Sequence, residues 1–399
     1  MTKIHTLAAA VALSLAAISV QAADVQMYGR VDAGLRYTNY HDSSKDDSFG
    51  LQAGNRAHNR IGLNIREDLG NGLQAKVYLE NGFTIDDGDM DTSGQLFNRR
   101  SILALKGGFG EVGMGRMGTV QSTVAPYSMG LIKWDPFATS YSQASIGSTF
   151  ANTSRVNNAI TWQSPSMAGW RLGATYSMGD SSDEIGDEYE AYADHDHTLA
   201  LATDYQNENL YLSLTYAHVA YGNVENGEMT DDGNLFGFGG WWRFMPQSKV
   251  YFGAQYQKHW DSAAGLGLKD MQNKTLWTYK PSEDYPDNRD KDVADKPTEA
   301  LAGGYDGYSL LLGGTYEFGQ NKLLASVQYF DGELANASEY DYNFLVFGTA
   351  WEYKLAKTVW FYVAATHSID GGKLSHEKFD NENARQAATE VMTGINWNF

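Results

Sequence analysis

Sixteen segments in which apolar and polar residues alternate run through almost the whole chain, and they constrain its fold more than any other feature. Alternation with a period of two is typical of a β-strand whose two faces meet different environments. Most segments are 9–14 residues long, close to the roughly 9–11 residues that a tilted strand needs to cross the hydrocarbon of a membrane. We predict strands at 25–38, 56–67, 72–84, 95–106, 109–118, 155–163, 168–178, 195–206, 209–220, 234–245, 248–260, 307–318, 321–332, 342–354, 357–369 and 388–399.

The gaps between these segments are short and long in strict alternation. The long gaps fall at 39–55, 85–94, 119–154, 179–194, 221–233, 261–306, 333–341 and 370–387. An up-and-down meander has this order, with its tight turns at one end and its long loops at the other, whereas a sandwich of Greek keys does not. A soluble secreted jelly roll or propeller is the alternative, but no propeller-like period recurs. We therefore predict an all-β fold, a 16-stranded antiparallel transmembrane β-barrel.

The first and last predicted strands each have an apolar face and a polar face. A sheet can span hydrocarbon only when it is closed, because every backbone N–H and C=O must be paired there. Sixteen strands enclose a space too wide for side chains to fill, so the polar face borders an aqueous channel. The alternation places Asp32, Arg36, Arg66 and Glu80 among the residues that we expect to face this lumen.

The first 22 residues have the pattern of a secretory signal peptide. Lys3 supplies the basic start, residues 7–20 the apolar core, and Val20-Gln21-Ala22 the cleavage site with small residues. We predict that residues 1–22 are removed and that residues 23–399 form a single barrel domain.

Composition excludes several classes of function. The chain has no cysteine, so disulfides, thiolate metal sites and cysteine nucleophiles are absent. Its 49 acidic residues outnumber its 30 basic ones, and so acidic a protein repels nucleic acid. We expect no nucleic-acid partner.

The long gap at 119–154 differs in composition from an ordinary solvated loop. It has 36 residues, of which only Lys133 and Asp135 are charged, and it includes Trp134, Phe137 and Tyr141. A loop of this length is usually either functional or disordered, and disordered segments are charged and poor in aromatic residues. We predict that this loop folds into the lumen and narrows the channel.

Other groups that are able to carry chemistry have simpler explanations. The run Asp194-His195-Asp196-His197 lacks a second cluster of metal ligands. Asp87, Asp89 and Asp91 have the opening spacing of a calcium loop but not its Gly or its final Glu. A calcium ion here that bridges lipopolysaccharide phosphates stays open as an alternative. No Ser–His spacing singles out His218 or His259 for catalysis, so we predict no enzyme activity, no cofactor and no metal.

Short motifs in a conserved-looking order connect this chain to a known family. The chain resembles the general Gram-negative porin family, most closely its glycine-rich betaproteobacterial members, over essentially all of the mature chain. Each motif is weak alone, but their order and spacing are specific. They are Met27-Tyr28-Gly29-Arg30-Val31-Asp32, Asn59-Arg60-Ile61-Gly62-Leu63, Glu67-Asp68-Leu69-Gly70-Asn71-Gly72-Leu73-Gln74-Ala75, Glu80-Asn81-Gly82-Phe83, Phe97-Asn98-Arg99, Phe109-Gly110-Glu111-Val112-Gly113-Met114-Gly115-Arg116, Arg155-Val156-Asn157-Asn158-Ala159-Ile160, Ser164-Pro165, Ala168-Gly169 and Phe399.

The resemblance implies a trimeric, water-filled diffusion channel in the outer membrane, with the third external loop as its constriction. It further implies that a row of basic residues, here Arg30, Arg60, Arg99 and Arg155, opposes acids on that loop. The alternation independently places Arg30 and Arg60 on the lumen face. By the same resemblance, Phe399 belongs to the signal that the barrel-assembly machinery reads.

The loop departs from the family pattern in its acidic residues. Where the family often has Pro-Glu-Phe-Gly-Gly, this chain has Pro126-Tyr127-Ser128-Met129-Gly130, and its only acid is Asp135, close to Lys133. We therefore expect the acidic side of the constriction to be weaker, or to be supplied by residues such as Asp32 or Glu80.

The function that follows is the passive diffusion of ions and small hydrophilic solutes, with a weak preference for anions set by the arginines. The expected partners are outer-membrane lipid, lipopolysaccharide and two further copies of the chain. A substrate-specific outer-membrane channel, or a non-conducting adhesin or structural barrel, is the alternative.

Overall fold

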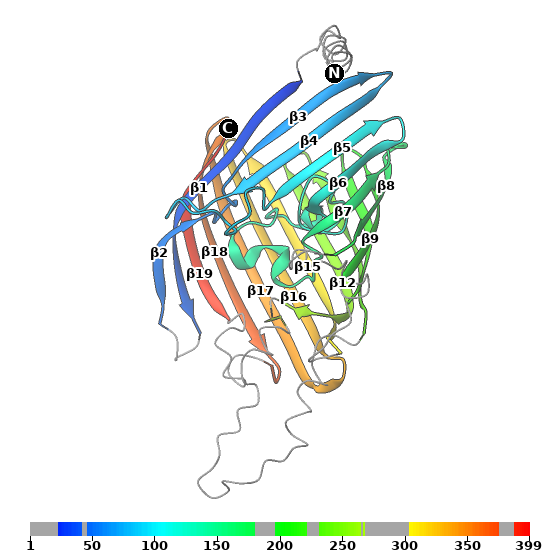
Figure 1. Ribbon diagram of the computed structural model, residues 1–399. Coiled ribbons are helices and arrows are strands. Elements are labelled where there is room, and N and C mark those ends of the chain that lie inside the picture. Colours follow the sequence, from blue (N-terminus) through cyan, green and yellow to red (C-terminus); the bar gives the residue numbers. More distant parts are fainter. Residues whose placement is uncertain are drawn as a thin grey trace, which may run out of the picture.

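The computed structural model describes residues 23–41, 46–179, 196–221, 231–264, 266–267, 303–374 and 387–399. Nearly all of its regular structure is β (Figure 1). The predicted signal peptide lies outside the described residues. The strands are β1 (Asp24–Tyr40), β2 (Ser48–Ala53), β3 (Arg60–Gly70), β4 (Leu73–Gly82), β5 (Arg100–Gly107), β6 (Gly110–Gly118), β7 (Arg155–Gln163), β8 (Trp170–Ser177), β9 (His197–Gln206), β10 (Leu210–Ala220), β11 (Gly233–Met245), β12 (Ser248–Trp260), β13 (Ser262–Ala263), β14 (Leu266–Gly267), β15 (Tyr305–Phe318), β16 (Asn321–Leu334), β17 (Ala337–Ala356), β18 (Val359–Gly371) and β19 (Ala388–Asn398).

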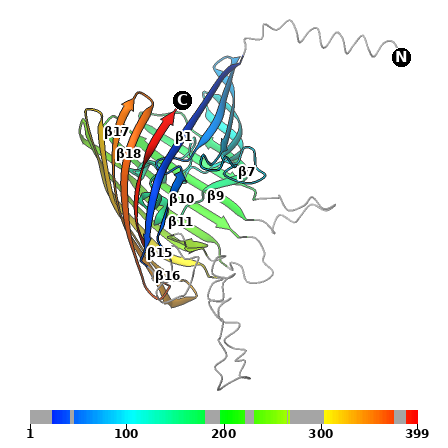
Figure 2. The same cartoon turned by 90° about the vertical axis from the view of Figure 1, so that its left-hand side faces the viewer.

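The sheet is a closed ring. Neighbouring strands of the ring pair antiparallel, in chain order apart from the small separate hairpin β13–β14, and β19 then pairs with β1 (Figure 2). At this seam Val31 lies opposite Trp397 and Tyr37 lies opposite Val391. Because both edges of the sheet are joined, no strand edge is left open there.

One sheet of 17 strands fills only 16 places in the ring, because β2 and β3 share a place. The first half of β1 pairs with β3, and the second half pairs with β2. The predicted all-β, 16-stranded antiparallel barrel is therefore confirmed. The expectation that 39–55 is only a loop was wrong, since β2 lies within it; its six residues are too short for the alternation to stand out.

The two faces of the sheet differ as predicted. In β10, Ser213 is 3% exposed on the inner side, whereas its neighbour Leu214 is 56% exposed on the outer side. Large apolar side chains are exposed in the same way along most strands. In water this apolar surface would be a liability, but hydrocarbon is the environment that it fits.

The strands β16 and β17 extend further than the alternation predicted. They continue to Leu334 and start at Ala337, so the predicted loop at 333–341 is instead a tight hairpin. Phe330, Tyr342 and Phe344 are fully buried in one cluster near this end. Burial of these rings stabilises strand ends that the local sequence describes only as polar.

Among the residues that the structure describes, the helices are short: α2 (Leu131–Trp134) and the 3₁₀ turns η1 (Ser142–Ala144) and η2 (Ile146–Ser148). All three lie in the long segment between β6 and β7 (Figure 1). Across the described residues there is no helix with the length and apolarity needed to span a membrane.

Candidate functional site

The segment 119–154 bonds to side chains of strands spread around more than half of the ring. The acceptors and donors all belong to the buried polar face of the sheet. A segment that reaches so many strands of a closed ring contacts them from the enclosed side. The contacts are Trp134 Nε1 to Ser213 Oγ (2.8 Å), the Ala151 N–H to Gln255 Oε1 (2.7 Å), Ser309 Oγ to the Thr149 carbonyl (2.6 Å), Thr149 Oγ1 to Gln328 Oε1 (2.8 Å), Tyr141 Oη to Glu352 Oε1 (2.7 Å) and Ser142 Oγ to Glu390 Oε1 (3.0 Å).

Helix α2 is seated on β11 and β12 by the indole of Trp134. Leu131 and Trp134 are buried in a cluster with Tyr211 and Trp241 of the wall. A Cβ at Gly237 would lie 2.7 Å from the Trp134 ring, so only glycine leaves room for the indole there. This wall therefore fixes the position of the middle of the loop.

Near its start, the segment is tied to the opposite wall through Tyr127. Tyr127 Oη donates to Glu111 Oε1 at 3.0 Å, and Tyr78 donates to the same oxygen at 3.1 Å. Lys76 Nζ lies 2.7 Å from the other oxygen of Glu111. The pKa of Tyr127 is raised, chiefly by burial, so the phenol stays protonated and donates.

The tip of the segment is held by a second group of charged residues. Glu352 accepts from Tyr141 and also from two nitrogens of Arg56, at 2.9 and 3.0 Å. Arg56 donates in addition to Asn396 Oδ1 (3.0 Å) and lies 4.9 Å from the Trp360 ring centre. Arg56 lies between β2 and β3. The sequence interpretation placed it at the start of the strand predicted at 56–67 and did not name it among the site residues.

Asp135 lies inside the loop rather than on its surface. It is 3% exposed, and its carboxylate accepts from the backbone N–H groups of Phe137 (2.8 Å), Thr139 (2.8 Å) and Ile146 (3.0 Å). Burial raises its pKa to about 6, against the opposing effect of the three donors. Asp135 thus stabilises the loop through these hydrogen bonds and does not face the arginine cavity.

The predicted arginines meet at a cavity of about 600 Å³ between the loop and the strands β1 to β7. Arg30, Arg60, Arg99 and Arg155 all line it, and Arg100, which sequence reasoning missed, joins them. Glu80 lies among them: Arg99 Nε is 2.9 Å and Arg60 Nη1 is 3.9 Å from Glu80 Oε1, and Arg100 bonds to Oε2. Three of the five guanidinium groups are therefore paired with this one carboxylate, and Arg99 also lies 3.8 Å from Asp91.

The loop side of this cavity is uncharged. Its lining there consists of residues such as Val124, Ile132, Thr139 and Ser145. Glu80, which was expected to help supply the acidic side, belongs to the basic wall instead. The charges of the described lining are thus one-sided, with cations on the strands and polar or apolar groups on the loop.

The remaining lumen candidates lie away from the cavity. Asp32 is fully buried and accepts from Tyr362 Oη at 2.9 Å. Arg36 donates to Asn55 and lies 3.8 Å from Glu390. Arg66 is exposed, opposite Lys76 towards the end of the barrel that carries the short turns. Lys133, on α2, is exposed and lies near Arg171 and Asp204; it does not line the arginine cavity.

A family model described as Gram-negative porin matches residues 6–372 of the chain. The chain belongs to the Gram-negative porin family. This membership confirms the family resemblance seen in the sequence, the predicted outer-membrane location and the prediction that the protein is not an enzyme.

Two curated relatives of this porin are outer membrane porin proteins. The one from Bordetella pertussis is 32% identical over 258 residues, 60% of this chain and 65% of the relative. The one from Delftia acidovorans is 30% identical over 205 residues, 48% of this chain and 56% of the relative. In each case the match spans less than two thirds of the relative's own length.

Solved structures share the fold of this porin at low sequence identity. An anion-selective porin from Comamonas acidovorans has a TM-score of 0.66 at 22% identity, with 95% of this chain and all of that chain covered. The outer membrane channel DcaP of Acinetobacter baumannii has a TM-score of 0.59 at 14% identity, covering 96% and 99%. These likenesses show the barrel fold.

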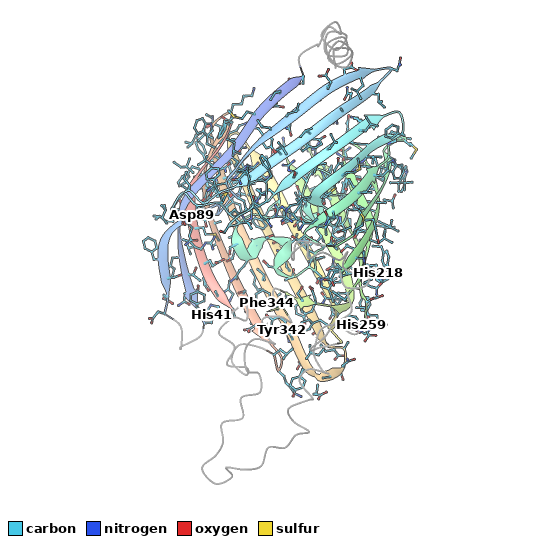
Figure 3. The ribbon with its side chains drawn as sticks, viewed as in Figure 1. His41, Asp89, His218, His259, Tyr342 and Phe344 are labelled. Atoms are coloured by element: carbon cyan, nitrogen blue, oxygen red, sulfur yellow. The ribbon has the colours of Figure 1, made fainter. Side chains whose placement is uncertain are left out.

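The histidines and acids considered for metal binding or catalysis form no such site among the residues that the structure describes. His218 lies 3.6 Å from Asp232, and His259 lies 3.9 Å from Asp306, and both histidines lie on the same side of the barrel in the view of Figure 3. The Asp89 N–H donates to Asp87 Oδ1 at 2.9 Å within the loop. Asp194 and His195 lie outside the described residues.

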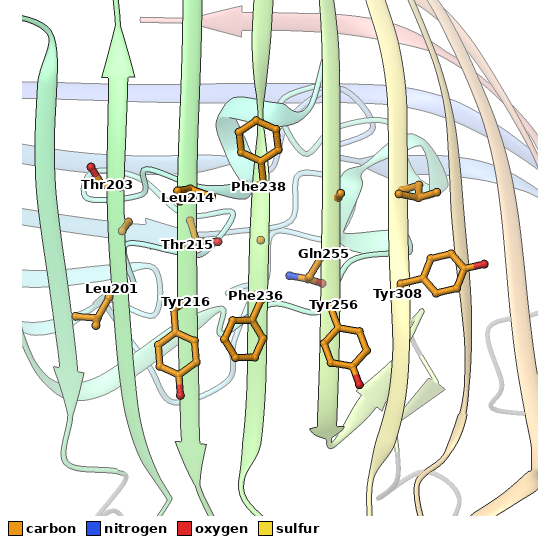
Figure 4. A pocket seen from close by; sticks show the side chains of 14 residues that line it. Leu201, Thr203, Leu214, Thr215, Tyr216, Phe236, Phe238, Gln255, Tyr256 and Tyr308 are labelled. Atoms are coloured by element: carbon orange, nitrogen blue, oxygen red, sulfur yellow. The ribbon is translucent and has the colours of Figure 1, made fainter.

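A second hollow, of about 730 Å³, lies on the outer, apolar face of the porin and not in the lumen. It is bordered by outward side chains of β9, β10, β11, β12 and β15, and the rings of Tyr216, Phe236 and Tyr256 lie side by side at one level (Figure 4). The small side chain of Ala254 lies between Phe238 and Leu310, which explains the depression. This hollow contributes nothing to the lumen site.

Proposed function

We propose that this porin is a passive channel through which ions and small hydrophilic solutes diffuse across the outer membrane, with a preference for anions. The segment 119–154 acts as the constriction, and the cavity beside it is the narrow part of the path. Lipid and lipopolysaccharide surround the barrel, and Phe399 contributes to the assembly signal.

The observation that supports this proposal is the one-sided charge of the cavity. Arg30, Arg60, Arg99, Arg100 and Arg155 face an uncharged loop, and Glu80 supplies the one carboxylate side chain among the described residues that line the cavity. A ring or ladder of one charge at a narrow point sets ion preference. The low-dielectric walls make this charge weigh more than the screened acids at the outer mouth. The related structure from Comamonas acidovorans, itself named as anion-selective, agrees with this direction.

We further propose that three copies associate through the outer face of β3–β6. The exposed large side chains within these strands are aliphatic or Met, such as Ile61, Leu103, Leu105 and Met114. Strands from β7 onward expose rings such as Trp170, Phe236 and Tyr308. Aromatic girdles mark the membrane interfaces of a lipid-facing wall, and their lack within β3–β6 favours contact with protein.

The test is single-channel conductance and reversal potential in a potassium chloride gradient across a planar bilayer. The wild-type protein is expected to conduct in steps, three per particle, with an anion-selective reversal potential. Arg155→Gln should lower the anion-to-cation permeability ratio about threefold. Arg66→Gln, which removes an arginine away from the cavity, should leave the ratio unchanged.

Two results would contradict the proposal. A cation-selective reversal potential would remove the assigned role of the arginines. Failure of liposomes containing the protein to swell in small sugars would favour a non-conducting adhesin or structural barrel instead.

A further inference from the structure

The side of α2 that faces away from the arginine cavity carries an exposed lysine. Helix α2 packs against β11 and β12 through Leu131 and Trp134, and Lys133 between them is left exposed to the lumen. The enclosing wall and the nearby charge of Arg171 lower the pKa of Lys133. This lysine therefore lies in a confined space that already contains positive charge.

The wall against which α2 packs carries two further cations, nearer the short-turn end of the strands. Arg243 of β11 lies directly across the strand pair from Lys249 of β12, next to the short turn that joins the strands. Lys249 Nζ is 4.0 Å and Arg243 Cζ is 5.9 Å from the centre of the Trp241 ring. Both cations thus contact the same indole ring, which holds them in place without neutralising them.

These cations have no ionic partner within the part of the chain that the structure describes. Neither Lys133, Arg243 nor Lys249 has a carboxylate oxygen within 4.0 Å. The neighbouring Arg171 shows the contrast, because its Nε donates to Asp204 Oδ1 at 3.0 Å and its charge is compensated.

The charged groups that act most strongly on Lys249 include Arg243, Lys322 and Lys133 on the positive side and Glu317 on the negative side. A confined surface with this surplus raises the local concentration of anions, since low-dielectric walls focus the field.

We propose that Lys133, Arg243 and Lys249 form a second anion-binding site, at the short-turn end of the lumen and separated by α2 from the arginine cavity. Its ligands are small multivalent anions such as di- and tricarboxylates, because one such anion pairs with several cations at once whereas chloride pairs with one. The inference rests on the proposed function and adds a site in series with the constriction. Short turns mark the periplasmic end of such barrels, so an anion leaving the arginines passes this site last.

The experiment uses the full-length protein in a planar bilayer carrying a chloride current, with citrate added to one chamber and then to the other. A site at one end of the lumen makes the block stronger from one side. The wild-type protein should show saturable block with a side-to-side ratio of about tenfold or more. Lys133→Gln/Lys249→Gln should bring this ratio close to one and weaken the stronger block about tenfold.

Lys258→Gln is the matched control, because Lys258 lies on the same strand as Lys249 but on the opposite face. It should retain the wild-type ratio. If the double variant does not insert, Lys249→Gln alone should reduce the ratio about threefold.

Equal block from both sides in the wild type, or a ratio that survives the double substitution, would overturn the inference while chloride selectivity still stands. A double variant that loses anion selectivity as fully as Arg155→Gln would also overturn it, since the lysines would then act with the constriction and not as a separate site. A wild-type protein without anion selectivity would instead refute the proposed function.

Discussion

At the scale of single residues, Asp135 and Glu80 show that an acid in or near a pore need not act on the permeating ion. Both carboxylate oxygens of Asp135 accept hydrogen bonds from backbone N–H groups. Glu80 forms ion pairs with three arginines. In both cases an acid that composition alone would assign to a transverse field has a structural role.

Substitution of Asp135 should therefore change the loop and not the selectivity. Asp135→Ala leaves three backbone donors without an acceptor and should raise open-channel noise severalfold. Asp135→Asn keeps one oxygen acceptor but turns an NH2 donor towards the remaining backbone N–H, so it should raise the noise less than Asp135→Ala does. Single-channel recordings measure the noise. A shift in reversal potential for either variant would contradict this assignment.

The pKa of Asp135 fixes the sign of a pH effect. In the folded protein the pKa of Asp135 is about 6, above the ordinary value of 3.8 for an aspartate. The folded loop therefore binds this proton more tightly than the unfolded chain does. Protonation below pH 6 therefore favours the ordered loop. Lowering the pH from 7.5 to 5 should not increase the noise through this group.

Sequence reasoning located four of the five arginines at the cavity and missed the fifth for a geometric reason. Alternation places adjacent residues on opposite faces, so Arg99 on the lumen face implies that Arg100 points outwards. In the structure β5 begins only at Arg100. Arg99 is outside the pleat of the strand, and both side chains reach Glu80.

At the scale of elements, the segment 119–154 is held at three places by different chemistry. Tyr127 binds a carboxylate near the start, Trp134 is buried in the middle, and Tyr141 binds Glu352 near the tip. A composition that is uncharged and aromatic predicts burial, but not which strands are contacted. Those partners are glycines and single polar residues on distant strands, which leave no local signal.

Weakening the tip should make the loop open more often. Tyr141→Phe removes a hydrogen bond to a charged acceptor, worth roughly 1.5–3 kcal/mol, so the population of the detached tip should rise about tenfold or more. Glu352→Gln should have a larger effect, because it also leaves Arg56 without its ionic partner. The readout is the frequency of brief conductance changes. Tyr308→Phe, on the outer face, is the control and should show the same frequency of brief conductance changes as the wild type.

A side chain added at Gly237, where Trp134 of α2 packs against the wall, should displace the helix. A Cβ at Gly237 would lie 2.6 Å from Thr215 Oγ1 and 2.7 Å from the Trp134 ring, so Gly237→Ala should shift single-channel conductance. Trp134→Phe in the same chain frees space and should restore part of the change. Gly314→Ala, whose new methyl group would meet only a backbone oxygen at 3.4 Å, is the matched control. Unchanged conductance in Gly237→Ala would show that this wall does not position the loop.

At the scale of the whole molecule, alternation and gap length were enough to predict a closed barrel. They did not reveal that β2 and β3 divide one place in the ring, because the six residues of β2 fell within the predicted loop at 39–55 and the next strand was predicted to begin at 56. The number of copies in an assembly is likewise not written in the alternation, since lipid and a neighbouring subunit both favour apolar side chains.

The proposed trimer face is testable because the chain has no cysteine of its own. Leu103 and Leu214 are 54% and 56% exposed in the single chain. A bimane label on Leu214→Cys should be quenched strongly by brominated lipids, whereas the label on Leu103→Cys should be protected if subunits meet there. Equal quenching at both sites would exclude β5 from a subunit contact.

The seam between β1 and β19 has a consequence for how such a molecule comes into being. It joins stretches of chain that are among the most distant in sequence, and every other strand must be in place before the two can meet. A partly assembled sheet would expose unpaired backbone N–H and C=O groups to hydrocarbon along both of its edge strands. Membrane insertion and barrel closure must therefore occur together, because a partly inserted sheet is not a stable intermediate.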